Sequence, residues 1–171
     1  VKRKNGQFIG SFAGYGYQKD PENKNHLIID EYAAEIVRFI FNLKMGGYSS
    51  QRIATKLNEM GVLPPLEYKR SRGMKYNSGF RSGANPKWAV TTVNRILTNE
   101  LYTGTMVQGK NRKINYKVKE CRPVAEENWI RVEKTHEAII AEEIFQYVQS
   151  LLELDTRTAP DEDSVYLFSG F

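Results

Sequence analysis

Residues 85–104 constrain the fold of this chain most strongly, because the centre of this segment has the periodicity of an amphipathic helix. Trp88 can anchor the start of that helix, and Asn99 followed by Gly104 marks its end. The apolar side chains that recur at three- and four-residue spacing are Val90, Val93, Ile96 and Leu97. This stripe should lie against a core that other elements complete.

The opposite face of the same helix carries short hydrogen-bonding side chains, one guanidinium group and no acid. Its residues are Thr91, Thr92, Asn94, Arg95 and Thr98. Such a face suits a helix in the major groove of DNA, where arginine pairs with guanine, asparagine with adenine, and threonine reaches bases or phosphates. An ordinary amphipathic helix with a solvated polar face is the alternative that this segment alone leaves open.

Charge is distributed unevenly along the 171 residues, whose net charge is +5. Residues 1–119 hold 21 Lys and Arg against 8 Asp and Glu, a net +13, whereas residues 120–171 hold 4 against 12, a net −8. A strongly basic body indicates a polyanionic partner, and nucleic acid is the usual one.

The remaining composition narrows the class of protein further. One cysteine, Cys121, excludes an internal disulfide, and His26 and His136 lie far apart without ligand spacing. We therefore expect no metal and no cofactor. The chain has no apolar run as long as a membrane span, so we expect no membrane partner and a cytoplasmic location.

Two helices are predicted before residue 62. The first begins at Asp30, whose carboxylate would cap the first-turn amides, and runs to about Lys44. Its buried stripe is Ala33, Ile36, Val37, Ile40 and Phe41. The second is capped by Ser49–Ser50 and closed by Gly61, and its predicted inner residues are Ile53, Ala54, Leu57 and Met60. A small inner residue such as Ala54 is typical of the first helix of a helix-turn-helix, because it lets a second helix cross closely.

Residues 62–87 separate this helix from the one near Trp88, where a standard helix-turn-helix has a short turn. From residue 68 to residue 87 the chain has three glycines, aromatic residues between its charges, and no acid. Such a long unpatterned loop is uncommon unless it is functional or disordered, and it could contact sugars and phosphates. A flexible solvated loop fits equally well. The basic residues of this loop are Lys69, Arg70, Arg72, Lys75, Arg81 and Lys87.

A small antiparallel sheet is predicted after the Trp88 helix, from an alternating strand at 102–108, a return strand at 115–119 and a third strand at 129–134. The turn at 109–113 makes its hairpin tip basic. A last helix at 137–154 has Glu142 and Glu143 in its first turns, where they favour the helix dipole, and its stripe is Ile140, Ile144, Val148, Leu151 and Leu152. The predicted class is α+β, with a mainly helical, helix-turn-helix-like core interrupted by a long loop, plus a small sheet or hairpin.

An ordered series of motifs carries a family resemblance over residues 10–154. It comprises Gly14-Tyr-Gly-Tyr17, Asp30-Glu31 with Ile36-Val-Arg-Phe-Ile-Phe41, Gly47-Tyr-Ser-Ser50 through Gly61, Trp88 through Tyr102-Thr-Gly104, and His136-Glu-Ala-Ile-Ile140. The series resembles the "recombinase" DNA-binding domain of the large serine recombinases, which serve phage integration and conjugative transposons.

The resemblance implies a catalytic domain with a nucleophilic serine before this region and a zinc ribbon with a coiled coil after it. We therefore expect residues 1–25 to be a lead-in, 26–154 the DNA-binding domain and 155–171 a linker. No serine here lies in the family's catalytic motif, so we expect no enzyme activity from this chain. The parent recombinase, of bacterial or mobile-element origin, would attack a DNA phosphate with serine, exchange subunits with its partner recombinase molecules and religate.

The resemblance further implies that this region holds and reads double-stranded DNA at one half of an attachment site. Base edges would be contacted by Thr91, Thr92, Asn94 and Arg95. The DNA backbone would be contacted by Gln51, Arg52, Lys56, Lys69, Arg70, Arg72, Lys75, Arg81, Lys87, Lys110, Arg112 and Lys113.

Three other classes remain open from the residues. A free-standing winged-helix-like transcription regulator is the leading one, and a two-fold operator would be its mark. A nuclease is disfavoured because no paired carboxylates with a basic partner occur at convincing spacing, and Glu142–Glu143 fits a helix start better. The aromatic and basic segments could also bind RNA.

Overall fold

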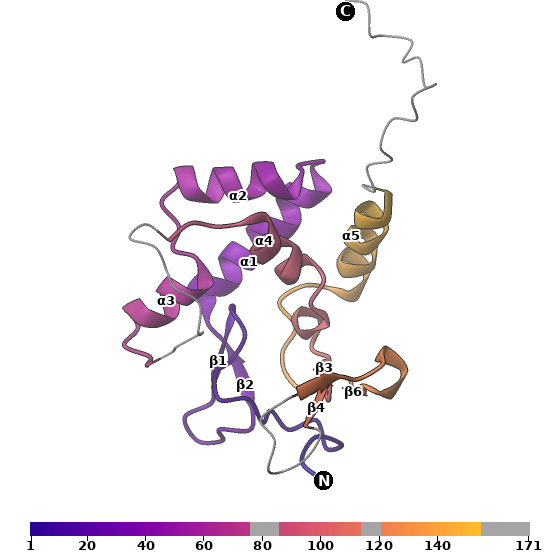
Figure 1. The fold of residues 1–171 in the computed structure, drawn as a ribbon. Helices are drawn as coiled ribbons and strands as arrows, with labels where there is room; N and C mark the ends of the chain where they lie inside the picture. The colour runs from indigo at the N-terminus through magenta and orange to yellow at the C-terminus, as the bar shows by residue number, and fades with distance from the viewer. Residues whose placement is uncertain (76–85, 114–120, 155–171) are drawn as a thin grey trace, which may run out of the picture.

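The computed structural model describes residues 1–75, 86–113 and 121–154, and within these ranges it confirms the predicted α+β class (Figure 1). The helices are α1 Glu31–Met45, α2 Ser50–Glu59, α3 Pro65–Ser71, α4 Val90–Leu97 and α5 Glu142–Leu154, with 3-10 turns η1 Glu100–Thr103 and η2 Glu126–Asn128. The strands are β1 Tyr17–Lys19, β2 Leu27–Ile29, β3 Met106–Gln108, β4 Asn111–Lys113, β5 Cys121–Pro123 and β6 Ile130–Val132. They pair antiparallel as β1–β2, β3–β6 and β4–β5.

The core lies where α1 packs against α2, α4 and α5, and where α2 packs against α4. The predicted stripes are confirmed for the side chains that are buried there, namely Ala33, Val37, Ile40, Phe41, Ile53, Ala54, Leu57, Val93, Ile96 and Leu97. The prediction for Met60 is wrong, since this side chain is exposed. Met60 is the C-cap of α2, and the chain turns away there through Gly61, whose φ is +69°.

Two aromatic side chains of the predicted lead-in belong to this core. Tyr15 and Tyr17 are buried, and Tyr17 lies in β1, opposite Ile29 of β2, where we had expected irregular chain. The Tyr17 hydroxyl donates to the Glu137 carbonyl at 2.8 Å, and the Tyr102 hydroxyl donates to the Tyr15 carbonyl at 2.9 Å. These bonds tie the N-terminal segment to the segment before α5 and to η1.

Asp30 occupies the N-cap position of α1 as predicted, but its side chain makes no capping hydrogen bond. The Tyr68 hydroxyl donates to the Asp30 carboxylate, 3.0 Å from each oxygen, and Arg72 forms an ion pair with it. Those partners come from α3 and its C-cap, so the prediction of an unpatterned loop is wrong for residues 65–71. Pro65 starts this helix, a position where the missing proline amide costs nothing. Residues 76–85 lie outside the described residues.

The hairpin after α4 differs from the predicted strands at its start. Residues 100–103 form η1 instead of strand, because the Asn99 side chain accepts from the Leu101 amide at 3.2 Å and Gly104 turns the chain with φ +85°. The predicted basic turn includes strand β4, and its observed partner is β5. The predicted return strand at 115–119 lies outside the described residues.

The last helix begins at Glu142, five residues later than predicted. The amides of Ile139 and Ile140 donate to the Tyr102 carbonyl, at 2.9 and 3.0 Å, so this segment is bonded to η1 and not to a helix of its own. Glu142 and Glu143 lie in the first turn of α5, as the charge argument required. Within α5, Val148 of the predicted stripe and Phe145 are the buried residues.

Candidate nucleic-acid interface

The start of α4 is fixed by a side-chain amide at the end of α2. Asn58 Oδ1 accepts from the Trp88 backbone amide at 2.8 Å, and Asn58 Nδ2 donates to the Trp88 carbonyl at 3.1 Å. The buried Trp88 indole donates to the Val62 carbonyl at 2.9 Å. This contact holds two helices in a defined relation, although 28 residues, 61–88, lie between the C-cap Met60 of α2 and the N-cap Ala89 of α4.

The polar face of α4 is exposed as predicted. Thr91, Asn94, Arg95 and Thr98 are exposed at positions i, i+3, i+4 and i+7, so the helix brings these four side chains onto one face. Thr92 lies at the edge of this face and is half-buried. Arg95 forms no ion pair with any described residue. The face therefore offers a guanidinium, an amide and hydroxyl groups without a neutralising acid.

Two cations of α2 lie over one aromatic ring. The Arg52 guanidinium carbon is 4.9 Å and the Lys56 nitrogen 5.7 Å from the centre of the Tyr48 ring. Gln51 is exposed beside them, and its amide donates to the Thr55 hydroxyl at 3.5 Å. Cation–π contact restricts where the two positive charges can lie, which favours an anion that binds at that place.

Several cations in and around α3 were predicted to contact the DNA backbone, and some of them already pair with acids of this chain. Arg70 pairs with Glu67 at 2.7 Å, and Arg72 pairs with Asp30. Lys69 is half-buried, and burial lowers the pKa of its amino group. The other cations of this set are Lys75 and Lys87, which are exposed, and Arg81, which lies outside the described residues.

The hairpin carries cations of two kinds. Arg131 on β6 is paired with Glu100, at 3.1 Å, and with Glu126. Lys110 lies 4.5 Å over the Trp129 ring and is exposed, and Arg112 is exposed on β4, where Lys113 follows it. Arg131 is thus neutralised by two acids, whereas Lys110 and Arg112 form no ion pair with a described residue.

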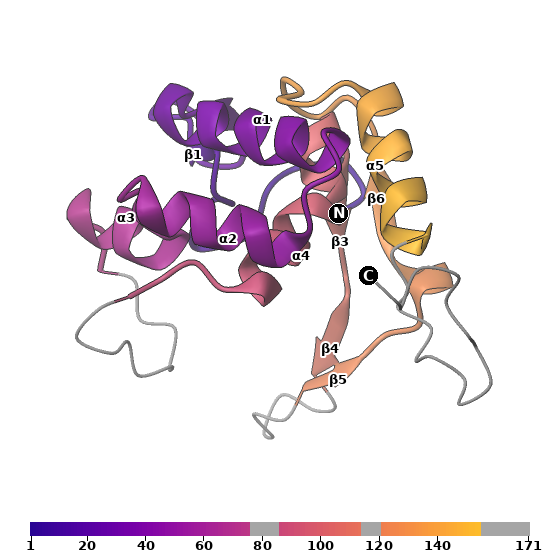
Figure 2. The ribbon, with the colours of Figure 1, turned by 90° about the horizontal axis from the view of Figure 1, so that it is seen from above.

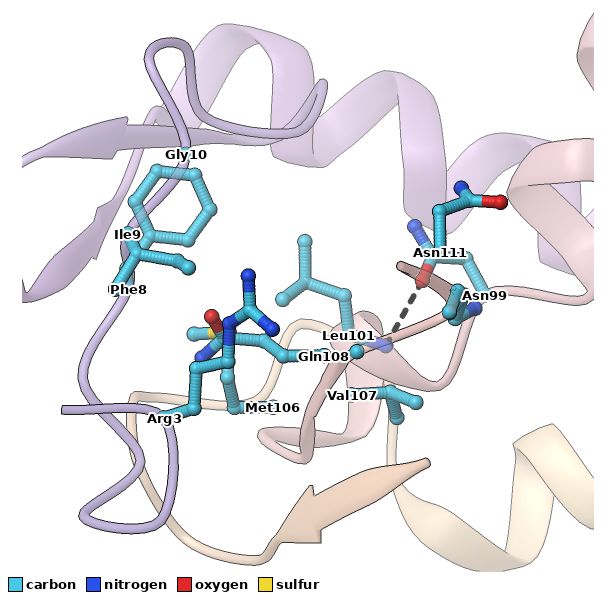
Figure 3. A pocket seen from close by; sticks show the side chains of 12 residues that line it. Arg3, Phe8, Ile9, Gly10, Asn99, Leu101, Met106, Val107, Gln108 and Asn111 are labelled. Carbon is cyan, nitrogen blue, oxygen red and sulfur yellow. Dashed lines mark hydrogen bonds between the residues drawn. The ribbon is translucent and has the colours of Figure 1, made fainter. Parts of the chain in front are cut away.

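A pocket of about 400 Å³ lies between the N-terminal segment and the η1–β3 region, shown in Figure 3. Phe8, Leu101 and Met106 supply apolar lining, and Arg3 and Lys110 supply positive charge. Its lining contains no Asp, Glu, His, Cys, Ser or Thr. We assign no reaction to this pocket.

Residues 1–75, 86–113 and 121–154 contain neither a metal-ion cluster nor a membrane-spanning helix. No group of three or more His, Cys, Asp or Glu side chains is placed to hold a metal ion in these ranges. None of the helices found there combines the length and the apolar character needed to cross a bilayer.

A family model described as "Recombinase" matches residues 31–155, which include all five helices and the hairpin. The chain belongs to the Recombinase family. The resemblance inferred from its ordered motifs is thereby confirmed. The matched range begins at α1, so it leaves out β1 and β2, although Tyr15 and Tyr17 complete the core of this recombinase domain.

Three known proteins show how far the similarity extends. The uncharacterized protein YefB of Bacillus subtilis (strain 168) is 36% identical over 103 residues, covering 56% of this chain and 34% of YefB. Two solved structures share the fold. One, "Crystal Structure of a LSR-DNA Complex", has a TM-score of 0.53 at 19% identity, over 90% of this chain and 35% of that one. The other, "Sequence Requirements of the Listeria innocua prophage attP site", has a TM-score of 0.52 at 22% identity, over 89% and 48%. This recombinase domain thus spans about a third of YefB.

Sequence reasoning missed two features of the candidate interface. Asn58 had no assigned role, because an asparagine near the end of a helix gives no sign of a partner 30 positions away. Arg122 was not considered either, since its place opposite Arg112 depends on the register of β4 and β5.

Proposed function

We propose that this recombinase domain binds double-stranded DNA at one half of an attachment site. The observation that carries the proposal is the exposed face of α4, where Thr91, Asn94, Arg95 and Thr98 lie together without an acid. These side-chain types match the donors and acceptors that base edges present in the major groove. The contact between Asn58 and Trp88 supports this role, because a helix that reads bases must be held in a fixed position.

The remaining cations suit the DNA backbone. Arg52 and Lys56, both over the Tyr48 ring, and the exposed Lys75, Lys87, Lys110 and Arg112 would neutralise phosphates. Arg70 and Arg72 would have to exchange or share their present carboxylate partners to do the same. We therefore expect them to contribute less to the salt dependence of binding than the cations without ion pairs.

The parent protein would be a serine site-specific recombinase that acts in the integration or transposition of a mobile element. It would work in the bacterial cytoplasm together with other recombinase subunits. Family membership supports this proposal, as do the two structural relatives, whose descriptions name an LSR–DNA complex and a prophage attP site. The chemistry of strand cleavage would be supplied by a catalytic serine domain of the parent protein.

Selection of bound duplexes from a random DNA pool, followed by titration of the selected duplex at several salt concentrations, tests the proposal. A half-site reader should enrich a non-palindromic sequence about one helical turn long and bind it with a steep salt dependence. A two-fold symmetric sequence would favour a free-standing regulator. Absence of any enriched sequence, or tighter binding to RNA, would refute base reading by α4.

Two substitutions separate base contacts from phosphate contacts. Arg95→Ala should lose about 1–3 kcal/mol on the selected duplex and relax the preference at one base pair. Arg52→Ala should weaken binding to all sequences nearly equally and reduce the salt slope by about 1. An equal loss on every sequence for Arg95→Ala would assign Arg95 to the backbone instead.

A further inference from the structure

The short ribbon formed by β4 and β5 places two arginines directly opposite each other. Arg112 and Arg122 are paired residues in this antiparallel ladder. Side chains of directly opposite residues leave the same face of a ribbon, with their Cβ atoms about 4.5–5.5 Å apart. Both residues are exposed, and neither forms an ion pair with a described residue.

This arrangement is unfavourable for the ribbon by itself. Like charges directly opposite each other destabilise a strand pair, and an isolated two-stranded ribbon is only marginally stable. Figure 2 shows β4 and β5 extending away from the helices, so helix packing does not cover them. Among the described residues no acid forms an ion pair with either arginine, and Glu100 and Glu126 are both bound to Arg131.

The base of the ribbon is nevertheless firmly held. The Val124 amide donates to the Lys110 carbonyl at 2.9 Å, and the Trp129 indole donates to the Val124 carbonyl at 2.8 Å. Lys110 and Arg131 both contact the Trp129 ring, at 4.5 and 5.3 Å from its centre. These hydrogen bonds and cation–π contacts fix the base of the ribbon that carries Arg112 and Arg122. The positive charge of the two guanidinium groups can therefore bind an anion from outside the chain.

We propose that Arg112 and Arg122 together hold one phosphate group of the DNA backbone. Each guanidinium presents a planar set of donors that matches phosphate oxygens, and a phosphate between the two groups would replace their repulsion by two attractive contacts. This inference rests on the proposed function, and it adds a second point of contact to the duplex that α4 reads. It assigns a role to Arg122 and makes the two arginines one site.

The number of phosphates bound by the pair can be measured from salt dependence. The full chain and its Arg112→Gln, Arg122→Gln and double variants would be titrated with the selected duplex at several salt concentrations. Because the slope of log K against log[salt] counts neutralised phosphates at about 0.9 each, a shared phosphate predicts that the double variant loses about 0.9. Two separate phosphates predict a loss of about 1.8. Each single variant should weaken binding about tenfold.

Chemical substitution of the DNA identifies the phosphate itself. Phosphates of the duplex would be replaced one at a time by uncharged methylphosphonates. A shared site predicts one position whose replacement weakens binding of the wild-type chain and of each single variant but has little further effect on the double variant. The control is Lys134→Gln, which removes one exposed positive charge after β6 and should leave the methylphosphonate profile unchanged.

The outcomes distinguish this inference from the proposed function. Two different phosphates for the two arginines, or unchanged binding of both variants while the wild-type chain binds its duplex, would overturn the shared site and leave DNA reading by α4 intact. Failure of the wild-type chain to bind any duplex would overturn both. In the free protein, Arg122→Gln should slow amide hydrogen exchange in β4, because it removes the repulsion; unchanged or faster exchange would contradict the like-charge argument.

Discussion

Replacement of Arg72 by glutamine tests whether the ion pair with Asp30 holds α3 on the rest of the domain. The Asp30 side chain is only 8% exposed, whereas that of Arg72 is 39% exposed. Arg72 also donates to the Gln18 side chain of β1 at 3.2 Å, and the Tyr68 hydroxyl donates to Asp30. One arginine thus connects α3 to the start of α1 and to β1.

The expected cost lies between the values for buried and exposed pairs. Removing one partner of a fully buried ion pair costs about 3–5 kcal/mol, and an exposed pair contributes about 0–1 kcal/mol. Without Arg72, the nearly buried Asp30 carboxylate keeps the Tyr68 hydroxyl as a donor, and water can reach the place of the half-exposed guanidinium. We therefore expect Arg72→Gln to lower the free energy of unfolding by about 1–3 kcal/mol.

Equilibrium urea unfolding of the full chain measures this loss. The control is Arg38→Gln on α1, whose guanidinium is about as exposed as that of Arg72 and lies 3.9 Å from the largely exposed Glu31 carboxylate. That substitution should change the free energy of unfolding by no more than about 0.5 kcal/mol. A loss for Arg72→Gln no greater than that of the control would refute the structural role. If Arg72 instead binds a phosphate, its substitution would reduce the salt slope of DNA binding by about 0.9.

Three further predictions concern the contacts that position the helices. Asn58→Ala should cost about 1–3 kcal/mol of unfolding free energy in urea, because two hydrogen bonds to Trp88 are lost. Gly104→Ala should lower the melting temperature more than Gly61→Ala, since both have positive φ but only at Gly104 would the new Cβ lie 2.8 Å from the His136 carbonyl. Burial lowers the pKa of His136, against a smaller opposing effect of its hydrogen bond to a carbonyl, so the unfolded chain binds the proton more readily. Stability should therefore be complete above about pH 6.5 and fall as the pH drops below it, and urea midpoints at pH 7.5 and 5.5 should differ less for His136→Gln.

The helices with a continuous apolar stripe were predictable, because burial of one face decides their register. This holds for α1, α2 and α4. The buried stripe of α4 also predicted which of its side chains are exposed, because they lie on the opposite face. α3 could not be found in this way, since none of its seven residues is buried. It is held by the hydrogen bond of Tyr68 to Asp30 and by the ion pair of Arg72 with Asp30. Asp30 is 42 positions from Arg72, and its local sequence predicts that it caps a helix instead.

Element boundaries failed where backbone bonds cross between distant segments. The Tyr102 carbonyl accepts from the amides of Ile139 and Ile140, which delays the start of α5, and nothing in the apolar spacing near residue 137 shows it. In the candidate interface, likewise, periodicity indicated which face of α4 is exposed. The amide of Asn58 and the register that pairs Arg112 with Arg122 became visible only in three dimensions.

The bond from the Trp88 indole to the Val62 carbonyl has a consequence for how domains of this kind can diverge. It joins the two ends of the segment between α2 and α4, so the spacing of the helices does not depend on what lies between those ends. Because its ends are joined, doubling the length of this segment would cost only about 0.6 kcal/mol of closure entropy. Relatives could lengthen or shorten the part of the segment that follows Arg72 while keeping the same helix pair, and an engineer could insert a peptide there, whereas replacement of α3 would remove Tyr68 and Arg72 from Asp30.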